Sequence, residues 1–463
     1  MTETYDLIAI GSGPAGESAT ELAAFFGHRS VVIEKNKPGG IVTTTGGVPT
    51  KTLREAALYF TGFRDGDVYG LRMAAPPDIA ADTIRNRTWS VCELLQEVTA
   101  DKIAKSNVDY VQGSARLGPG RTVVVTTPDG RECTLWAKVI LIATGSRSVR
   151  PKNIPFDAPG VCDTDTILHR GHVPKDILIV GGGPVGVEFA TICHALGALV
   201  TIADRGDRLI PMMDGEMSHQ MAELFRKWGV RVVFNSTADT VVSKDGKLEV
   251  LLSTREKLQP DTILFAAGRV ANTEGLGFDA AGVTLDSHGG IAVDEHFRTS
   301  VNGVYAAGDV LGPTLASIVM EQGRVAVCHA FGIPFESTVD PTPVSAVYGM
   351  PEVAAAGLTE EQCRERGLDY EVGRSDFDLI PRGAIASRGG LLKLIFLKES
   401  RKLIGVHCIG DIASELIGIG QMVIRCGGTM NTIAFMSMNT PTYSYAYKYA
   451  AFDGLRRLAA AQR

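Results

Sequence analysis

The sequence contains no C-x-x-C or C-x4-C pair, although eight cysteines are spread over its 463 residues. Without such spacing the cysteines predict neither a metal site nor a local redox pair, and we interpret them as small buried side chains. The one close histidine pair, His169 and His172, has no other ligand types around it, so we expect no metal. Histidine is missing altogether after His407.

An excess of charge of one sign is also missing. The chain has 46 Lys and Arg against 52 Asp and Glu, a net charge of −6, which gives no electrostatic reason to expect nucleic acid or an anionic membrane. The longest apolar region, residues 177–203, is interrupted by a glycine turn and by Glu188, which favours strand–turn–helix–strand over a membrane span. The acidic, polar N-terminus predicts no signal peptide, so we expect a cytoplasmic protein.

Glycine, by contrast, is abundant, with 52 residues that indicate tight turns and close backbone approaches. The length predicts two to three domains. A strand over 5–10, a glycine turn, a helix to about Gly27 and a strand over 30–33 recur as a second set between 177 and 203. This repetition predicts two similar nucleotide-binding units. Between them we expect a loop over 39–51 and a helix from Thr52 to about Phe63.

The second unit ends near residues 263–269, and the first resumes at 303–309, so the second is predicted to be inserted in the first. From about Pro341, strands over 391–397 and 403–409 and helices over 411–426 and 443–458 predict a separate α+β domain. The predicted domain limits are 1–147 and 271–340 for the first unit, 148–270 for the inserted unit, and 341–463 for the C-terminal domain.

The first glycine turn, Gly11-x-Gly13-x-x-Gly16, follows a strand, opens a helix and precedes Glu34 at the end of the next strand. The glycines let backbone N–H groups approach a pyrophosphate at the helix N-terminus. The Glu34 carboxylate can accept hydrogen bonds from both ribose hydroxyls. The turn therefore predicts a dinucleotide site.

The second turn, Gly181-x-Gly183-x-x-Gly186, repeats these features, with Asp204 as the acid. A carboxylate there favours a free ribose 2′-hydroxyl and repels a 2′-phosphate, so NAD(H) is expected in preference to NADP(H). Arg205 stands beside it and could engage a 2′-phosphate, which leaves NADP(H) open.

Several further motifs give the chain an end-to-end resemblance to the pyridine nucleotide–disulfide oxidoreductase family, and most of all to its soluble, Si-specific transhydrogenase branch. These motifs are Gly39-Gly40, Pro49-Thr50-Lys51-Thr52-Leu53-Arg54-Glu55-Ala56, Ala143-Thr144-Gly145, Ala307-Gly308-Asp309, Met320-Glu321-Gln322-Gly323-Arg324 and Pro441-Thr442. The resemblance implies an α/β fold of two Rossmann-like domains, for FAD and for NAD(P), the second inserted in the first. It also implies a C-terminal α+β dimerisation domain, and hence a homodimer.

The resemblance also implies roles for individual residues. Asp309 would hydrogen-bond the FAD ribityl chain, the helix from Leu315 and Ala316 would point its positive end at the flavin, and Lys51 with Glu188 would form an ion pair near flavin N5. The residues expected at FAD are Gly11, Gly13, Pro14, Ala15, Gly16, Glu34, Lys35, Gly40, Val42, Lys51, Ala115, Thr144, Gly145, Asp309, Leu315 and Ala316. Those expected at the nicotinamide nucleotide are Gly181, Gly183, Gly186, Glu188, Asp204, Arg205 and Gly268.

The sequence departs from the family pattern at its redox residues. Val42 and Gly47 stand at the two cysteine positions of the disulfide reductases, and Thr440 and Tyr445 stand where those enzymes carry a histidine and a glutamate. Neither Val nor Gly can form a thiolate, so disulfide reductase activity is not expected. Polar and aromatic residues that could contact another acceptor are Thr43, Thr44, Thr440, Tyr443 and Tyr445, although ordinary packing also explains the tyrosines.

Three functions fit these observations. The first is hydride transfer from a nicotinamide nucleotide through FAD to a second nicotinamide nucleotide, and the second is transfer to a quinone, a small-molecule intermediate or oxygen. The third is a flavin-containing binding or regulatory protein. The sequence gives no evidence for a protein partner other than a second copy of the chain.

Overall fold

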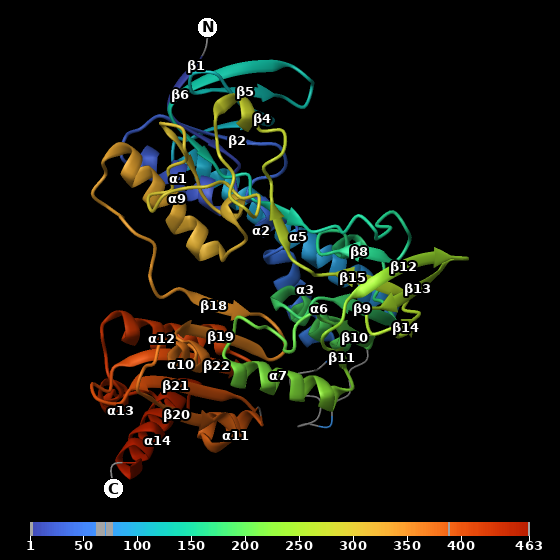
Figure 1. The fold of residues 1–463 in the computed structure, drawn as a ribbon, viewed down its shortest axis with the longest axis vertical. Helices are drawn as coiled ribbons and strands as arrows, with labels where there is room; N and C mark the ends of the chain where they lie inside the picture. The colour runs from blue at the N-terminus through green and yellow to red at the C-terminus, as the bar shows by residue number, and fades with distance from the viewer. Residues whose placement is uncertain (1–2, 62–69, 71–76, 388, 462–463) are drawn as a thin grey trace.

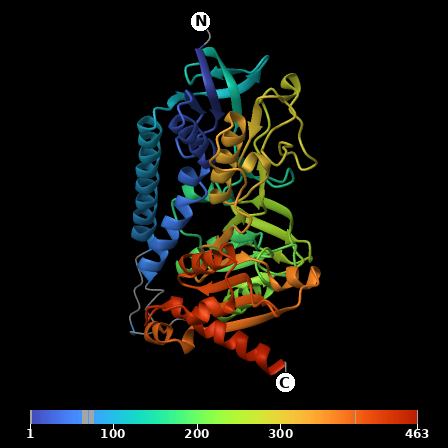
Figure 2. The same cartoon turned by 90° about the vertical axis from the view of Figure 1, so that its left-hand side faces the viewer.

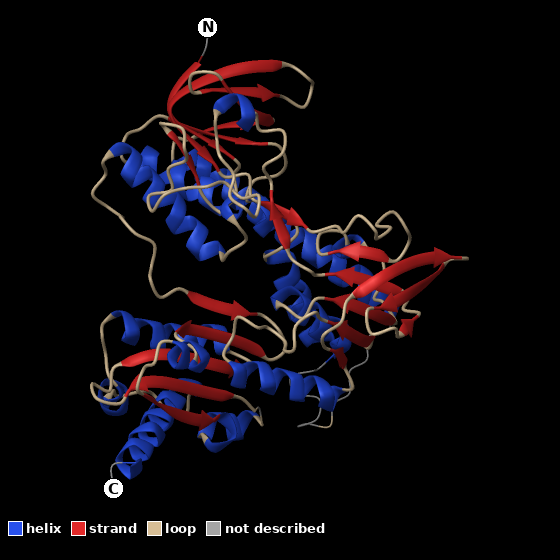
Figure 3. Cartoon of the chain, in the orientation of Figure 1, coloured by secondary structure: helices blue, strands red, loops and turns tan. Residues whose placement is uncertain are grey.

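A computed structural model describes residues 3–61, 70, 77–387 and 389–461. Figure 1 shows three units: one built from both early and middle parts of the chain, one that projects to its side, and a C-terminal unit below them. The first two units combine strands with helices, and the third is an open sheet with helices packed against it (Figure 3). No helix within the described ranges has both the length and the apolar character needed to cross a bilayer.

The first unit is built on a seven-stranded sheet with the order β3-β2-β1-β6-β5-β4, to which β17 adds beside β6. Its strands are β1 (Glu3–Ile10), β2 (Ser30–Glu34), β3 (Asp109–Gln112), β4 (Ser114–Gly118), β5 (Thr122–Thr126), β6 (Glu132–Ile142) and β17 (Val304–Ala306). Its helices are α1 (Pro14–Phe25), α2 (Gly40–Thr44), α3 (Val48–Thr61), α5 (Pro77–Lys105), α8 (Phe278–Ala281) and α9 (Ala316–Phe331). Since β17 pairs in parallel with β6, this sheet contains strands that precede the second unit in the sequence and one that follows it.

The second unit has a five-stranded parallel sheet with the order β11-β10-β9-β15-β8. Its strands are β8 (Val161–Asp163), β9 (Asp176–Val180), β10 (Leu199–Ala203), β11 (Arg231–Val233) and β15 (Thr262–Phe265), and its helices are α6 (Pro184–Ala195) and α7 (Gly215–Trp228). An antiparallel sheet extends from it, formed by β12 (Ala238–Lys244), β13 (Lys247–Leu252) and β14 (Lys257–Leu258). A two-stranded ribbon of β7 (Ser146–Ser148) and β16 (Arg269–Ala271) joins it to the first unit.

The C-terminal unit is a five-stranded antiparallel sheet with the order β18-β19-β22-β21-β20. Its strands are β18 (Val344–Val347), β19 (Glu352–Gly357), β20 (Tyr370–Asp376), β21 (Leu391–Leu397) and β22 (Leu403–Gly410). Its helices are α10 (Glu360–Glu365), α11 (Pro381–Ala386), α12 (Ala413–Arg425), α13 (Met430–Phe435) and α14 (Ala446–Ala461). The predicted fold class, two Rossmann-like units followed by an α+β domain, is confirmed.

The predicted loop over 39–51 is wrong, because most of it is helical. Helix α2 covers Gly40–Thr44, and α3 begins at Val48 instead of Thr52. The hydroxyls of Thr44 and Thr50 donate to the carbonyls of Gly40 and Gly46 at 2.9 Å, so these threonines bond within their own helical turns. The expected end of the helix near Phe63 lies outside the described residues.

Two long helices were not predicted from the sequence. Helix α5 packs along α3 and α2 and stands at one side of the molecule (Figure 2, light blue). Helix α7 lies beside the C-terminal sheet (Figure 1). Its N-cap residue, Asp214, accepts a hydrogen bond at 2.7 Å from the Nζ of Lys393 on β21. The buried Lys393 ammonium therefore links the second unit to the C-terminal unit.

Candidate functional site

The first glycine turn joins β1 to α1 and depends on the absence of side chains at two of its positions. Gly11 has a φ of 110°, and a Cβ there would collide with the carbonyl oxygen of Ala143; a Cβ on Gly16 would collide with the Gly11 carbonyl. Gly13 faces open space and caps α1 without a side-chain hydrogen bond. The free N–H groups of the first helical turn are thus open to an anion.

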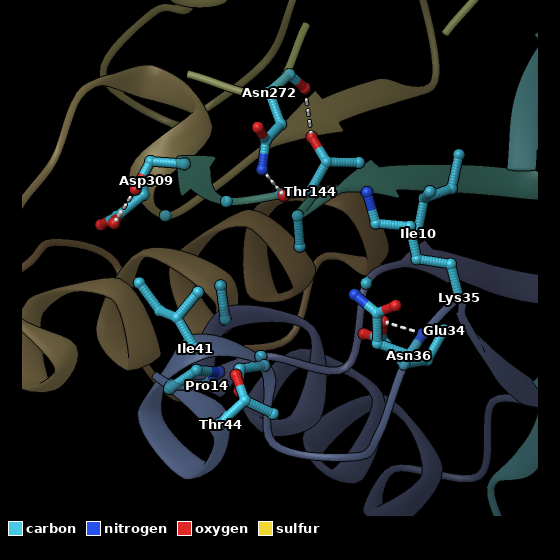
Figure 4. Close-up of a pocket in the computed structure, with 18 of the residues that line it drawn as sticks. Ile10, Pro14, Glu34, Lys35, Asn36, Ile41, Thr44, Thr144, Asn272 and Asp309 are labelled. Carbon is cyan, nitrogen blue, oxygen red and sulfur yellow. Dashed lines mark hydrogen bonds between the residues drawn. The ribbon is translucent and has the colours of Figure 1, made fainter. Parts of the chain in front are cut away.

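This turn opens into a cavity of about 530 Å³, called the first cavity below. Figure 4 shows Glu34 and Asp309 on opposite sides of it, with Pro14 of α1 between them. The residues expected at FAD that line it are Gly11, Gly13, Pro14, Ala15, Glu34, Lys35, Gly40, Val42, Ala115, Thr144, Gly145, Asp309 and Ala316. Gly16, Lys51 and Leu315 are outside the lining. An anion site flanked by two carboxylates fits the pyrophosphate and the hydroxyl-bearing parts of FAD.

The Glu34 carboxylate is oriented by the turn itself. Its Oε2 accepts from the backbone N–H and the hydroxyl of Ser12 at 2.9 and 3.0 Å, and its Oε1 accepts from the N–H of Asn36 at 2.8 Å. A carboxylate oxygen accepts about two hydrogen bonds, so Oε1 keeps one free position while Oε2 is filled. Glu34 can therefore take one ribose hydroxyl directly, and a second only if the Ser12 hydroxyl turns away.

At the other end, Asp309 belongs to a network that the sequence did not predict. Its Oδ2 accepts from the Ser146 hydroxyl at 2.7 Å, and that hydroxyl accepts from Nε of Arg269 at 2.8 Å. Asn272 and Thr144 exchange two side-chain to backbone hydrogen bonds at 2.8 and 2.9 Å (Figure 4). Ser146 directly follows the motif Ala143-Thr144-Gly145, and Arg269 directly follows Gly268, which was the sequence signal for these two residues. Asn272 had no such signal.

The second glycine turn repeats the geometry of the first. Gly181 has a φ of 117°, Gly183 faces open space, and Asp204 accepts from the N–H groups of Gly182 and Gly206 at 2.5 and 2.6 Å. A cavity of about 370 Å³, the second cavity, opens here. The expected residues that line it are Gly181, Gly183, Asp204, Arg205 and Gly268, while Gly186 and Glu188 are outside the lining. Each Asp204 oxygen keeps one position for a ribose hydroxyl.

Lys51 and Glu188 are 137 positions apart in the sequence and form a close ion pair. Nζ of Lys51, on α3, lies 3.0 and 2.9 Å from the two carboxylate oxygens of Glu188, on α6. The Glu188 side chain is 7% exposed and that of Lys51 35%. A pair with one nearly buried partner has a stronger interaction than a surface pair, because water screens it less.

The two positions that carry cysteines in disulfide reductases lie side by side. A Cβ placed on Gly47 would be 3.2 Å from Cγ1 of Val42 and 3.3 Å from its Cα. Val42 also lines the first cavity, and its described lining contains no cysteine. Positions 42 and 47 are therefore in contact beside the cavity, and neither residue carries sulfur.

The residues expected at an acceptor are divided by the structure. Thr44 lines the first cavity, whereas Thr43 is buried and its hydroxyl donates to the Pro38 carbonyl at 2.8 Å. Tyr443 is buried in the C-terminal core against Phe377, with ring centroids 5.1 Å apart. Thr440, Tyr443 and Tyr445 of the same chain are outside the described lining of the first cavity. Ordinary packing accounts for Tyr443.

Comparisons with known proteins agree with this geometry. Residues 5–327 match the model of the pyridine nucleotide-disulphide oxidoreductase family, and residues 344–451 match that of its dimerisation domain. Soluble pyridine nucleotide transhydrogenases from Mycobacterium tuberculosis (strain ATCC 25177 / H37Ra) and Pseudomonas aeruginosa (strain LESB58) are 35% identical over 460 and 464 residues. The alignments cover 98% of this chain in both cases, and 98% and 99% of the two relatives.

Two solved structures are similar over nearly the whole chain. LpdA from Mycobacterium tuberculosis is 26% identical with a TM-score of 0.89, and covers 98% of this chain and 99% of its own. The Cu(II) complex of the HOCl-induced flavoprotein disulfide reductase RclA from Escherichia coli is 26% identical with a TM-score of 0.87 and the same coverage.

Proposed function

The chain belongs to the pyridine nucleotide-disulphide oxidoreductase family, and on that premise we propose that it oxidises a nicotinamide nucleotide and reduces a diffusible acceptor other than a disulfide. Membership makes the protein an FAD-dependent pyridine nucleotide oxidoreductase. The acceptor we favour is a second nicotinamide nucleotide, since the relatives at 35% identity are named transhydrogenases.

One observation carries the choice of acceptor. Val42 and Gly47 lie side by side where disulfide reductases have their cysteines, and without a thiolate no mixed disulfide can form with a substrate. The missing histidine and glutamate, replaced by Thr440 and Tyr445, agree with it, because a dithiol relay needs an acid–base group and direct hydride transfer does not. FAD, when bound, supplies the redox chemistry of the reaction.

The remaining work falls to the protein's own groups. FAD is held by the N–H groups at the start of α1 and by the carboxylates of Glu34 and Asp309. The nicotinamide nucleotide is held by the N–H groups at the start of α6. The Lys51 ammonium places a positive charge near the redox centre. Glu188 balances that charge when no nucleotide is bound.

The choice of acceptor is tested by two separate half-reactions. We expect NADH to bleach the flavin absorbance anaerobically and thio-NADP+ to restore it, because both steps need only hydride transfer. Glutathione disulfide and lipoamide should restore it at least about a hundred-fold more slowly, since no thiolate is present. Stopped-flow absorbance measures all four reactions.

Each alternative has its own outcome in that experiment. Fast reoxidation by a disulfide contradicts the proposal. Reoxidation by menadione or oxygen, but by no nicotinamide analogue, assigns the transfer of electrons to a quinone, a small-molecule intermediate or oxygen. The apolar Ile41 and Val42 in the cavity wall favour this function. A flavin that neither NADH nor NADPH bleaches assigns a binding or regulatory role.

We propose NAD(H) as the preferred nucleotide, because the Asp204 carboxylate would stand close to a 2′-phosphate. The wild-type chain is expected to bind NADH about ten-fold more tightly than NADPH, as about 1.4 kcal/mol of repulsion gives that ratio. Arg205→Leu should leave the NADH affinity within about two-fold and weaken NADPH further, since only a 2′-phosphate can use the guanidinium. Fluorescence titration of both variants measures this, and tighter NADPH binding by the wild type would reverse the assignment.

We also propose that the protein works as a homodimer through its C-terminal domain, which matches the family's dimerisation domain. In this arrangement Thr440 and Tyr445 reach the flavin site of the other protomer. That explains why they are outside the first cavity of their own chain.

A further inference from the structure

The turn that follows β18 brings a third residue to the Lys51–Glu188 pair. The backbone N–H of Tyr348 donates to Oε1 of Glu188 at 3.0 Å, and Nζ of Lys51 lies 4.8 Å from the centroid of the Tyr348 ring. Lys51 is on α3, Glu188 on α6, and Tyr348 at the start of the C-terminal sheet, so each of the three units supplies one group. One residue thus contacts the anion with its backbone and the cation with its ring face.

The backbone at Tyr348 is fixed independently of this ion pair. Nε of the buried Arg54 donates to the Gly349 carbonyl at 2.9 Å, and its guanidinium pairs with Glu352 at 3.2 Å. The other oxygen of Glu352 accepts from the N–H and hydroxyl of Ser414 at 3.0 and 2.7 Å. Because this turn is held by several hydrogen bonds, the Tyr348 ring can restrict the position of the Lys51 side chain.

Besides this ring, the Glu188 carboxylate is the strong partner of the Lys51 ammonium among the contacts of the described residues. Apart from the Glu188 carboxylate, its ammonium is 3.4 Å from the hydroxyl of Thr50, a long contact. A lysine side chain loses considerable rotamer entropy when it is fixed in one position. Burial raises the pKa of the Tyr348 phenol, so the ring stays neutral and its face stays available to a cation.

We propose that Tyr348 is a positioning residue, which fixes the Lys51 ammonium through its ring and the Glu188 carboxylate through its backbone N–H. The inference rests on the role proposed above for the Lys51–Glu188 pair. It adds that the C-terminal domain, through Tyr348, sets the position of the Lys51 ammonium near the redox centre. Since the backbone contact does not depend on the side chain, substitution of Tyr348 isolates the contribution of the ring.

Three variants at position 348 distinguish the effect of the aromatic ring from the effect of side-chain volume. Tyr348→Phe keeps the ring face, so flavin reduction by NADH should stay within about two-fold of wild type. Tyr348→Leu and Tyr348→Met fill similar space without a ring, and reduction should slow about three- to ten-fold, as expected for the loss of one cation–π contact. The flavin midpoint potential should fall in these two variants as well, because a displaced cation stabilises the reduced flavin less.

Lys51→Met provides the reference for the mechanism. If Tyr348 acts through Lys51, adding Tyr348→Leu to Lys51→Met should change neither the reduction rate nor the midpoint potential further. An additive effect, a wild-type rate and potential in Tyr348→Leu, or loss of FAD from both non-aromatic variants would overturn the inference. A wild-type rate in Lys51→Met would overturn the role of the ion pair itself. The identity of the acceptor is decided separately by reoxidation, which these measurements do not involve.

Discussion

The variant Gly13→Asp is expected to fold and to purify without flavin. Gly13 has a φ of −66°, which any residue adopts, and a Cβ there meets no atom within 4 Å. Aspartate is also a favourable N-cap for α1. Its carboxylate, however, would occupy the place of the pyrophosphate, and two like charges in contact cost several kcal/mol. An affinity loss of at least about a hundred-fold follows.

The matched control is Gly183→Asp, because Gly183 also faces open space at the corresponding position of the second turn. This variant should keep its flavin absorbance and lose its reduction by NADH. FAD content per chain, circular dichroism and anaerobic bleaching distinguish the two variants. If Gly13→Asp retained full FAD, the first turn would not be the pyrophosphate site.

The second large effect is expected at the buried charge that joins α7 to the C-terminal sheet. Nζ of Lys393, a side chain only 1% exposed, lies 2.7, 3.0 and 2.5 Å from carboxylate oxygens of Asp214, Glu216 and Glu360. Lys393→Met would remove the paired cation of the buried Asp214, while Glu216 and Glu360 would keep Arg374. Removing one partner of a buried pair typically costs about 3–5 kcal/mol, so the free energy of unfolding should fall by that amount.

Lys398→Met is the control for this substitution. Lys398 pairs with Asp369 at 2.7 Å, but Asp369 is 79% exposed, and surface pairs contribute less than about 1 kcal/mol. Urea denaturation at fixed protein concentration and saturating FAD compares the two variants. Equal losses in both would contradict the importance of burial at Lys393.

The acid dependence of stability gives an independent check on the same network. Burial acts to raise the pKa values of Asp214 and Glu216, but hydrogen bonds and nearby positive charges outweigh it and hold both pKa values below their ordinary 3.8 and 4.5. Their contribution is therefore complete above about pH 4.5 and is lost as the pH falls through the lowered values. Burial also lowers the pKa of His407 from 6.5, so a gentler loss should begin below that pH. Lys393→Met should flatten the steeper, more acidic part.

The sequence by itself was sufficient to predict the two glycine turns and the fold class. A strand, a turn that opens with a glycine at positive φ and a helix are encoded within about twenty residues, because strand and helix periodicity and glycine conformation are local properties. The repetition of that pattern from Ile177 onward predicted the inserted unit, and the absence of cysteine at Val42 and Gly47 required no structure at all.

The tertiary structure alone decided which distant side chains meet. Ser146 with Arg269, Tyr348 with Lys51, and Lys393 with Asp214 are each separated by more than a hundred positions. No periodic pattern connects such pairs, because their contact depends on how three units pack. Even neighbouring residues were divided in this way: helix α2 turns Thr43 inward and leaves Thr44 at the cavity. Local backbone conformation determines the glycine turns, whereas packing between the units determines which charged side chains lie around them.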